Sequence, residues 1–254
     1  MAHVASGRHD CCCRGYSGLF HMLKVDLHTH TSDDPVDFIP YSTVQLIDRA
    51  AELGFGALAI TLHDRQRDLR EVLAYARERG IVLIPGVERT IHGRHVLLLN
   101  FPAAAESVES FESVVRLKTR HPEGLVVAPH PFYPHWSCLQ GLMDRHADLF
   151  DVVEINAFYT ATFDFNCAAI RWARMHRKPV VGNSDAHRLP LLGTSYSLVD
   201  AEFNADAICS AIRSGRVQVH TRPLSVVEAG TYFAKLVVGS LRLTQAGRPL
   251  PVPA

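Results

Sequence analysis

Residues 23–34, LKVDLHTHTSDD, join a short apolar run to a dense group of metal-capable side chains. The run Leu23–Leu27 has the length and apolar character of a buried parallel strand. His28 and His30 follow it directly, and Asp34 lies just beyond them. Because side-chain direction repeats every second residue in an extended segment, His28 and His30 point to the same side and can chelate one metal ion. The stretch predicts a strand whose end carries part of a metal site.

The same arrangement recurs along most of the chain. Metal-capable side chains follow the apolar runs 57–62, 81–87, 125–129 and 179–184, and another one opens the run HVLLL at residue 95. In a barrel of parallel strands, the C-terminal strand ends converge on one mouth. The pattern therefore predicts an α/β fold, a TIM-like barrel of about seven strand–helix units, with these side chains gathered at its mouth. The candidate metal ligands are His28, His30, Asp34, His63, Glu88, His95, His130, Asp185 and His187.

Strand and helix signals alternate over residues 22–222, which predicts one barrel domain. Residues 91–99 contain a His-Gly turn and are expected to form a hairpin appended to the mouth. Residues 1–21 lack periodicity and are expected to be a disordered N-terminal extension, and 223–254 a C-terminal helix, Leu224–Leu241, with a frayed tail. Helices are expected over 43–53, 68–79, 107–120, 138–149, 166–176 and 205–213, and the last barrel strand over 216–220.

The composition is that of an ordinary globular protein: 254 residues, 47% of them hydrophobic and 20% charged. A formal net charge of +0 argues against strong bulk affinity for nucleic acid or for an anionic membrane. No apolar stretch has the length of a membrane span. The six cysteines, three of them consecutive at 11–13, form no metal or disulfide framework, so free thiols and a cytoplasmic location are expected. The oligomeric state stays open.

Imidazole and carboxylate ligands without thiolate suit manganese, iron or zinc. Nine ligands are too many for one metal with an open position, so two or three divalent metals are expected, with Glu88 as the best candidate for a bridging carboxylate. A hydroxide that bridges two metals is a strong nucleophile at neutral pH. Catalysis is accordingly expected to depend on Asp185 and His187.

Two arginines lie next to candidate ligands in the sequence. Arg65 follows His63-Asp64, and Arg188 follows His187. At the mouth, each guanidinium could hold a phosphate through two hydrogen bonds, although a solvated loop arginine is as good an interpretation. Glu154, in the run DVVEI, is a candidate to support a ligand from behind, and His220 is better interpreted as structural.

The motifs DLHTHTSDD, AITLHD, IPGVE, HVLLL, APHPF and GNSDAH together resemble those of the PHP (polymerase and histidinol phosphatase) superfamily. The resemblance runs from about residue 23 to residue 220 and implies a distorted (βα)7 barrel with a trinuclear metal centre. It implies one metal on His28, His30, Glu88 and Asp185, a second on the acidic residue after the first motif, His63 and His187, and a third on Glu88, His95 and His130.

The chain departs from the family pattern in two places. The loop after His30 is shorter than the usual HxHxxxSDG, so that either Asp33 or Asp34 could be the acidic ligand, and Pro35 favours Asp34 by fixing the backbone beside it. Leu62 stands where the family motif usually has a polar residue. Metal stoichiometry and substrate choice are therefore less constrained than the fold.

The resemblance implies a metal-dependent phosphoesterase that hydrolyses small phosphomonoesters, of the nucleotide or oligonucleotide-end type, by means of a metal-bridging hydroxide. Two alternatives are an amidohydrolase-like hydrolase of C–O or C–N bonds and a non-catalytic, metal-stabilised module. Retention of all nine ligands argues against the non-catalytic module.

Overall fold

A single mixed sheet organises the part of the chain that the structure, a computed structural model, describes, namely residues 22–232 and 234. The strand order is β7-β6-β5-β4-β3-β2-β1-β8-β9. The strands are β1 (Met22–Thr29), β2 (Ala57–Ile60), β3 (Val82–Ile91), β4 (Arg94–Leu99), β5 (Leu125–Ala128), β6 (Val152–Asn156), β7 (Val180–Asn183), β8 (Ser195–Asp200) and β9 (Val217–Thr221).

The sheet curls into a nearly closed barrel because β1 has a different neighbour at each end. At its start, Met22–Val25 pair antiparallel with β8. At its far end, Thr29 forms a bridge with Ala186, just beyond β7. Between β7 and β8 the seam is closed by side chains, since the Gly182 N–H donates to Ser197 Oγ at 2.8 Å. A Cβ at Gly182 would lie 2.8 Å from the Tyr196 carbonyl oxygen, so this close approach requires glycine.

The α/β class is confirmed, but the sheet is not the parallel one that the repeating pattern predicts. Strands β1–β3 and β5–β7 form parallel pairs. The predicted hairpin exists, but β4 is inserted antiparallel between β3 and β5 and is not an appendage. The last strand, β9, is antiparallel to β8, and the sequence did not reveal β8 at all. With alternating residues buried and half-buried, β8 lacks the continuous apolar run that marks a central parallel strand.

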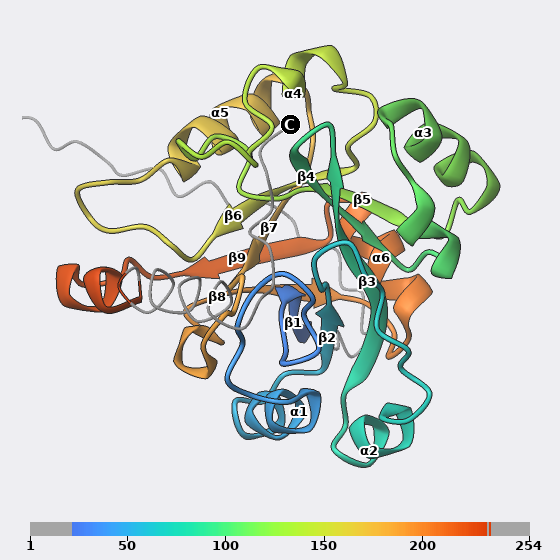
Figure 1. Ribbon diagram of the computed structural model, residues 1–254, viewed down its shortest axis with the longest axis vertical. Coiled ribbons are helices and arrows are strands. Elements are labelled where there is room, and N and C mark those ends of the chain that lie inside the picture. Colours follow the sequence, from blue (N-terminus) through green and yellow to red (C-terminus); the bar gives the residue numbers. More distant parts are fainter. Residues whose placement is uncertain (1–21, 233, 235–254) are drawn as a thin grey trace, which may run out of the picture.

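Helices surround the strands, as Figure 1 shows for α1 to α5. The helices α1 (Thr43–Glu52) and α2 (Leu73–Glu78) cover β2 and β3 through one apolar cluster. The helices α3 (Phe111–Arg120), α4 (Leu142–Arg145) and α5 (Asn166–Met175) cover β4 to β6 through another. The helix α6 (Ala205–Arg213) packs on the apolar cluster inside the barrel. Its residue Arg213 ion-pairs with Asp151, just before the start of β6. The helix α6 therefore closes the end of the barrel at which the parallel strands begin, which is called the lower end.

Capping side chains begin two of the helices that the sequence predicts correctly. Ser42 caps α1 through a capping box with Gln45, and α6 has its predicted bounds, with Asn204 as its N-cap. The helices predicted over 68–79 and 138–149 were too long. Only Leu73–Glu78 and Leu142–Arg145 are α-helical, and neither helix has a side-chain cap at its start. The remaining short elements are the 3-10 helices η1 (Ala103–Ser107) and η2 (Leu189–Leu191).

The prediction for residues 1–21 lies outside the described residues. In the predicted helix Leu224–Leu241, residues 226–232 are helical, whereas 233 and 235–241 lie outside the described residues. Among the residues that the structure does describe, no helix is both long enough and apolar enough to span a membrane.

Candidate metal centre

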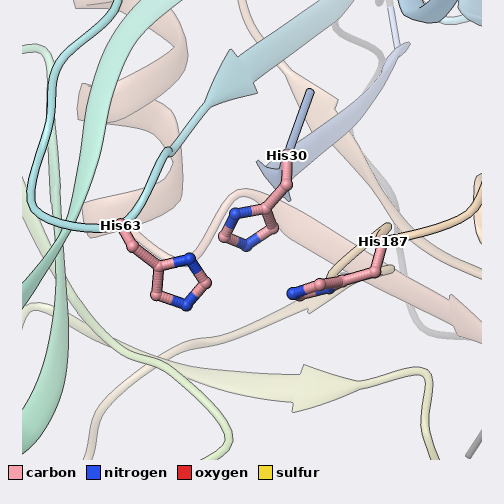
Figure 2. Close-up of side chains that lie close together, drawn as sticks. All are labelled: His30, His63 and His187. Carbon is pink, nitrogen blue, oxygen red and sulfur yellow. The ribbon is translucent and has the colours of Figure 1, made fainter. Parts of the chain in front are cut away.

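Side chains from six strands, β1 to β5 and β7, or from the segments that follow them meet at one end of the barrel. The ring centroids of His28, on β1, and His130, after β5, are 5.7 Å apart. Figure 2 shows the imidazoles of His30, His63 and His187 facing a common space from three separate segments. Their ligand atoms lie within 4.8 Å of one another. The structure also groups His28 with His130 and Asp185, His28 with His30 and Glu88, and His63 with Glu88 and His95.

The carboxylate of Glu88 stands at the centre of this group and is 1% exposed. Its two oxygens face different imidazoles. Oε2 lies 3.3 Å from His28 Nε2, 3.5 Å from His30 Nε2 and 3.2 Å from His63 Nε2, whereas Oε1 lies 2.6 Å from His95 Nδ1 and 3.2 Å from His130 Nε2. One carboxylate with each oxygen turned to a separate set of donors has the geometry of a bridge between two cations.

A second group of acceptors holds the imidazoles from behind. The Nδ1 of His28 lies 2.9 Å from Glu154 Oε1, and the Nδ1 atoms of His30 and His63 lie 2.9 and 3.0 Å from Asp34 Oδ2. An ionised carboxylate can only accept, so each of these Nδ1 atoms carries the proton. The ring is thereby fixed in the tautomer whose Nε2 presents a lone pair, as is usual for histidines that bind metals.

The two remaining rings have different partners behind them. His187 Nδ1 lies 3.0 Å from the backbone oxygen of Asp185, and His130 Nδ1 lies 3.3 Å from Cys138 Sγ. Glu154 also accepts from the side chain of Asn183 and from the His130 N–H. The supporting position proposed for Glu154 from the sequence is where the structure has this residue.

The donor set fits divalent cations. The Nε2 lone pairs of His28 and His30 point at oxygens of Glu88 and Asp185, 3.3 to 3.5 Å away, so acceptor faces acceptor. In the described part of the chain, His28 Nε2, His30 Nε2, His95 Nδ1 and Asp185 Oδ1 are all buried without a hydrogen-bond partner. Buried polar atoms that converge without partners are stabilised when a cation lies between them, and nitrogen with oxygen ligands suits manganese, iron or zinc.

The electrostatics of the cluster favour positive charge. Burial by itself would raise the pKa of Glu88, but the positive charges of His95, His28 and His63 outweigh it and hold that pKa well below its usual range. Burial by itself would lower the pKa of His63, but Glu88 and Asp34 outweigh it and raise that pKa to about 9. The negative potential that holds protons on these rings also attracts metal ions.

Two of the candidate ligands sit on unusual backbone. Asp185 has a φ of 49° and His130 a φ of 29°, in the left-handed region that non-glycine residues seldom adopt. Such conformations cost about 1–3 kcal/mol each and persist where the surrounding structure fixes them. At these two positions the strained backbone aims the side chain into the cluster.

Some predicted site residues lie elsewhere. Asp33 is turned outward, where its carboxylate pairs with Arg67 and the Thr43 hydroxyl. Arg65 is exposed and Arg188 half-buried at the mouth, and both stay predictions as phosphate ligands. Sequence reasoning did not single out Asp37, whose Oδ2 lies 3.0 Å from His187 Nε2, or the contact of Cys138 with His130. Neither residue follows an apolar run, so the pattern that revealed the other residues could not reveal them.

Segments of this chain are similar in sequence to known proteins. A family model described as PHP-associated matches residues 164–217. A DNA polymerase III of PolC type from Caldanaerobacter subterraneus subsp. tengcongensis is 40% identical over 65 residues, which are 26% of this chain and 5% of that protein. A 3',5'-nucleoside bisphosphate phosphatase from Chromobacterium violaceum is 38% identical over 77 residues, 30% of this chain and 26% of that protein. Each match spans far less than two thirds of the relative.

The fold has a solved counterpart in a two-domain protein from Bacteroides vulgatus that contains a predicted PHP-like metal-dependent phosphoesterase. Its structure covers 92% of this chain, which spans 75% of that one, with a TM-score of 0.64 and 18% sequence identity. At this identity the likeness concerns the fold alone. The PHP-associated segment and the two sequence relatives confirm the resemblance to the PHP superfamily that the motifs predict, and the fold agrees with it.

Proposed function

We propose that this chain is a metal-dependent phosphoesterase that hydrolyses small phosphomonoesters of the nucleotide or oligonucleotide-end type. The observation that carries the proposal is the Glu88 carboxylate, whose two oxygens face two sets of imidazoles at the barrel mouth. The site is buried at its floor and open at its rim. The side chain of His28 is 0% exposed, whereas those of His187 and Asp185 are 15% and 21% exposed. A small substrate can therefore reach the rim while the floor holds the cations.

The geometry supports two or three cation positions. His28, His30, Glu88 and Asp185 would hold one cation, His63 and His187 with a carboxylate a second, and His95, His130 and Glu88 a third. When bound, divalent manganese, iron or zinc supplies Lewis acidity, which lowers the pKa of a water and offsets charge on phosphoryl oxygens. Glu88 would be shared by two of these positions, and Glu154 and Asp34 would keep the ring nitrogens of His28 and His30 aimed at them.

The two mouth arginines would hold the substrate phosphate. Arg65 is two residues beyond His63, and Arg188 directly follows His187. A guanidinium binds phosphate through two parallel hydrogen bonds, which positions the ester before the reaction. Asp185 and His187, at the exposed rim, are the ligands nearest to an incoming substrate.

The test is a phosphate-release screen of protein loaded with manganese, against nucleotides, short oligonucleotide ends, sugar phosphates and aminoalcohol phosphates. Release from nucleotides is expected to be fastest, and Asp185→Ala is expected to abolish it. Single-turnover hydrolysis in ¹⁸O-water should place solvent oxygen in the first phosphate released. Turnover without ¹⁸O in that phosphate would contradict direct attack by water. Ester or amide hydrolysis without phosphate release would point to amidohydrolase chemistry and overturn the proposal.

Arg65→Ala and Arg188→Ala should mainly raise KM, because a residue that binds ground state and transition state equally affects KM more than kcat. An unchanged KM in both variants would remove them from the site.

A further inference from the structure

We infer that Asp37, and not Asp33 or Asp34, is the carboxylate ligand of the cation held by His187, and that Asp34 is a positioning residue. The inference rests on the proposed function only in so far as the site binds metal. It concerns which acidic residue of the 33–37 loop completes the position that His63 and His187 begin, a choice that the sequence leaves open.

Asp34 has no oxygen left for a cation. Its Oδ2 accepts the His63 N–H at 3.0 Å and faces two imidazole Nδ1 atoms, and its Oδ1 accepts the N–H groups of Val36 and Asp37, both at 2.9 Å. The carboxylate is 0% exposed.

Asp37 is in the opposite situation. Its Oδ2 lies 3.0 Å from His187 Nε2 and 4.0 Å from His63 Nδ1, and its side chain is 31% exposed at the rim. His187 Nδ1 lies 3.0 Å from the Asp185 backbone oxygen, which can accept its proton and leave the Nε2 atom that faces Asp37 free to bind a cation. A cation bound by both Nε2 and the Asp37 carboxylate then joins two groups that already face each other.

The contrast separates two layers of carboxylates. Oxygens of Glu88, Asp185 and Asp37 face the Nε2 atoms of His28 and His187, the ring nitrogens that would bind a cation, as oxygens of co-ligands do. Asp34 and Glu154 face protonated Nδ1 atoms, as orienting acceptors do.

Asp34 also holds the backbone of Asp37 in place. Asp34 accepts the backbone N–H of Asp37, so the orienting carboxylate fixes the loop that carries the ligand. Pro35 between them restricts the backbone further. Asp34 thus positions His30, His63 and Asp37 together.

The test compares Asp37→Ala, Asp34→Ala and the control Asp33→Ala, which removes a carboxylate of the same loop that faces Arg67. Each variant is loaded with manganese, dialysed, and analysed for metal per chain by mass spectrometry and for manganese affinity by titration calorimetry. Melting of the metal-free proteins reports whether each variant folds.

Asp37→Ala should lose about one metal ion per chain, because the second position keeps only imidazoles. Asp34→Ala should keep the stoichiometry but weaken manganese binding by roughly 10–100-fold, the usual cost of losing an orienting partner. Asp33→Ala should match the parent protein. Full metal content and parental affinity in Asp37→Ala would overturn the inference, as would loss of a metal in Asp34→Ala alone. If Asp34→Ala fails to fold, Asp37→Ala and Asp33→Ala still decide. A parent protein that binds no metal would instead contradict the proposed function.

Discussion

The interior of the barrel has two halves of opposite chemistry, built on the same strands. Along β3, every second residue runs from Ile84 through Gly86 to Glu88, and along β6 from Val152 to Glu154. Lower down, the residues belong to one apolar cluster that α6 closes. Higher up, they are the carboxylates and imidazoles of the candidate metal centre.

The lower half of the barrel stabilises the fold, whereas the upper half carries the candidate metal ligands. The lower half buries aliphatic side chains completely and gains free energy of folding from their removal from water. The upper half buries charged groups, whose desolvation costs free energy unless cations or ion pairs compensate. A mutation in the lower half should therefore lower the stability of the fold without changing metal content, whereas one in the upper half should change metal content, and stability only through the metal that is lost.

The largest effect is expected from the upper half. Glu88→Gln removes one charge from a carboxylate that faces two sets of imidazoles, so metal occupancy should fall at two positions together. Loss of this electrostatic stabilisation should lower kcat by about 10³-fold. Glu52→Gln, at an exposed position of α1, serves as the control. Loss of metal at a single position would show that Glu88 does not bridge.

Removal of metal should separate the two halves thermodynamically. A ligand at about 1,000 times its Kd stabilises the folded state by roughly 4 kcal/mol, which corresponds to a change in Tm on the order of 10 °C for a domain of this size. Calorimetric scans with and without a chelator measure the shift. Equal Tm values in the two scans would mean that the buried charges need no cation.

The lower half is tested by Leu97→Ala. Leu97 lies directly opposite Glu88 in the β3–β4 register but is fully buried in the apolar cluster. The cavity should lower the free energy of unfolding by about 2–5 kcal/mol, measured by urea denaturation. Metal per chain should stay at the parental value. A variant that folds but loses metal would show that the two halves are coupled through this strand pair.

The smallest effect is expected at a thiol, for which the two halves offer a matched pair. Cys138 contacts His130 Nδ1 in the upper half, and Cys209, in α6, is buried in the lower half. Cys138→Ala should weaken manganese binding at the position of His95 and His130 by roughly 10-fold, as loss of an orienting partner does. Cys209→Ala should leave it unchanged. Identical titrations of the two variants would leave Cys138 without a role in metal binding.

The ends of the buried strands could be predicted from the sequence because a buried strand is a contiguous apolar run. The residue that follows such a run must lie at the end of the strand. This rule found β1, β2, β3, β5, β6 and β7 and the metal-capable residues that follow them. It could not find β8, whose residues alternate in burial. It also predicted β9 as another parallel strand, because an apolar run does not show in which direction the strand runs relative to its neighbours.

The sequence by itself determined which side chains could bind metal, since their types and their places after apolar runs are local properties. Only the tertiary structure decided how each one is used. Asp34 and Asp37 are three residues apart in one loop, yet one faces protonated Nδ1 atoms and the other the Nε2 of His187, which comes from beyond β7. The proton on each imidazole is set by the acceptor behind it, and that acceptor comes from another part of the chain.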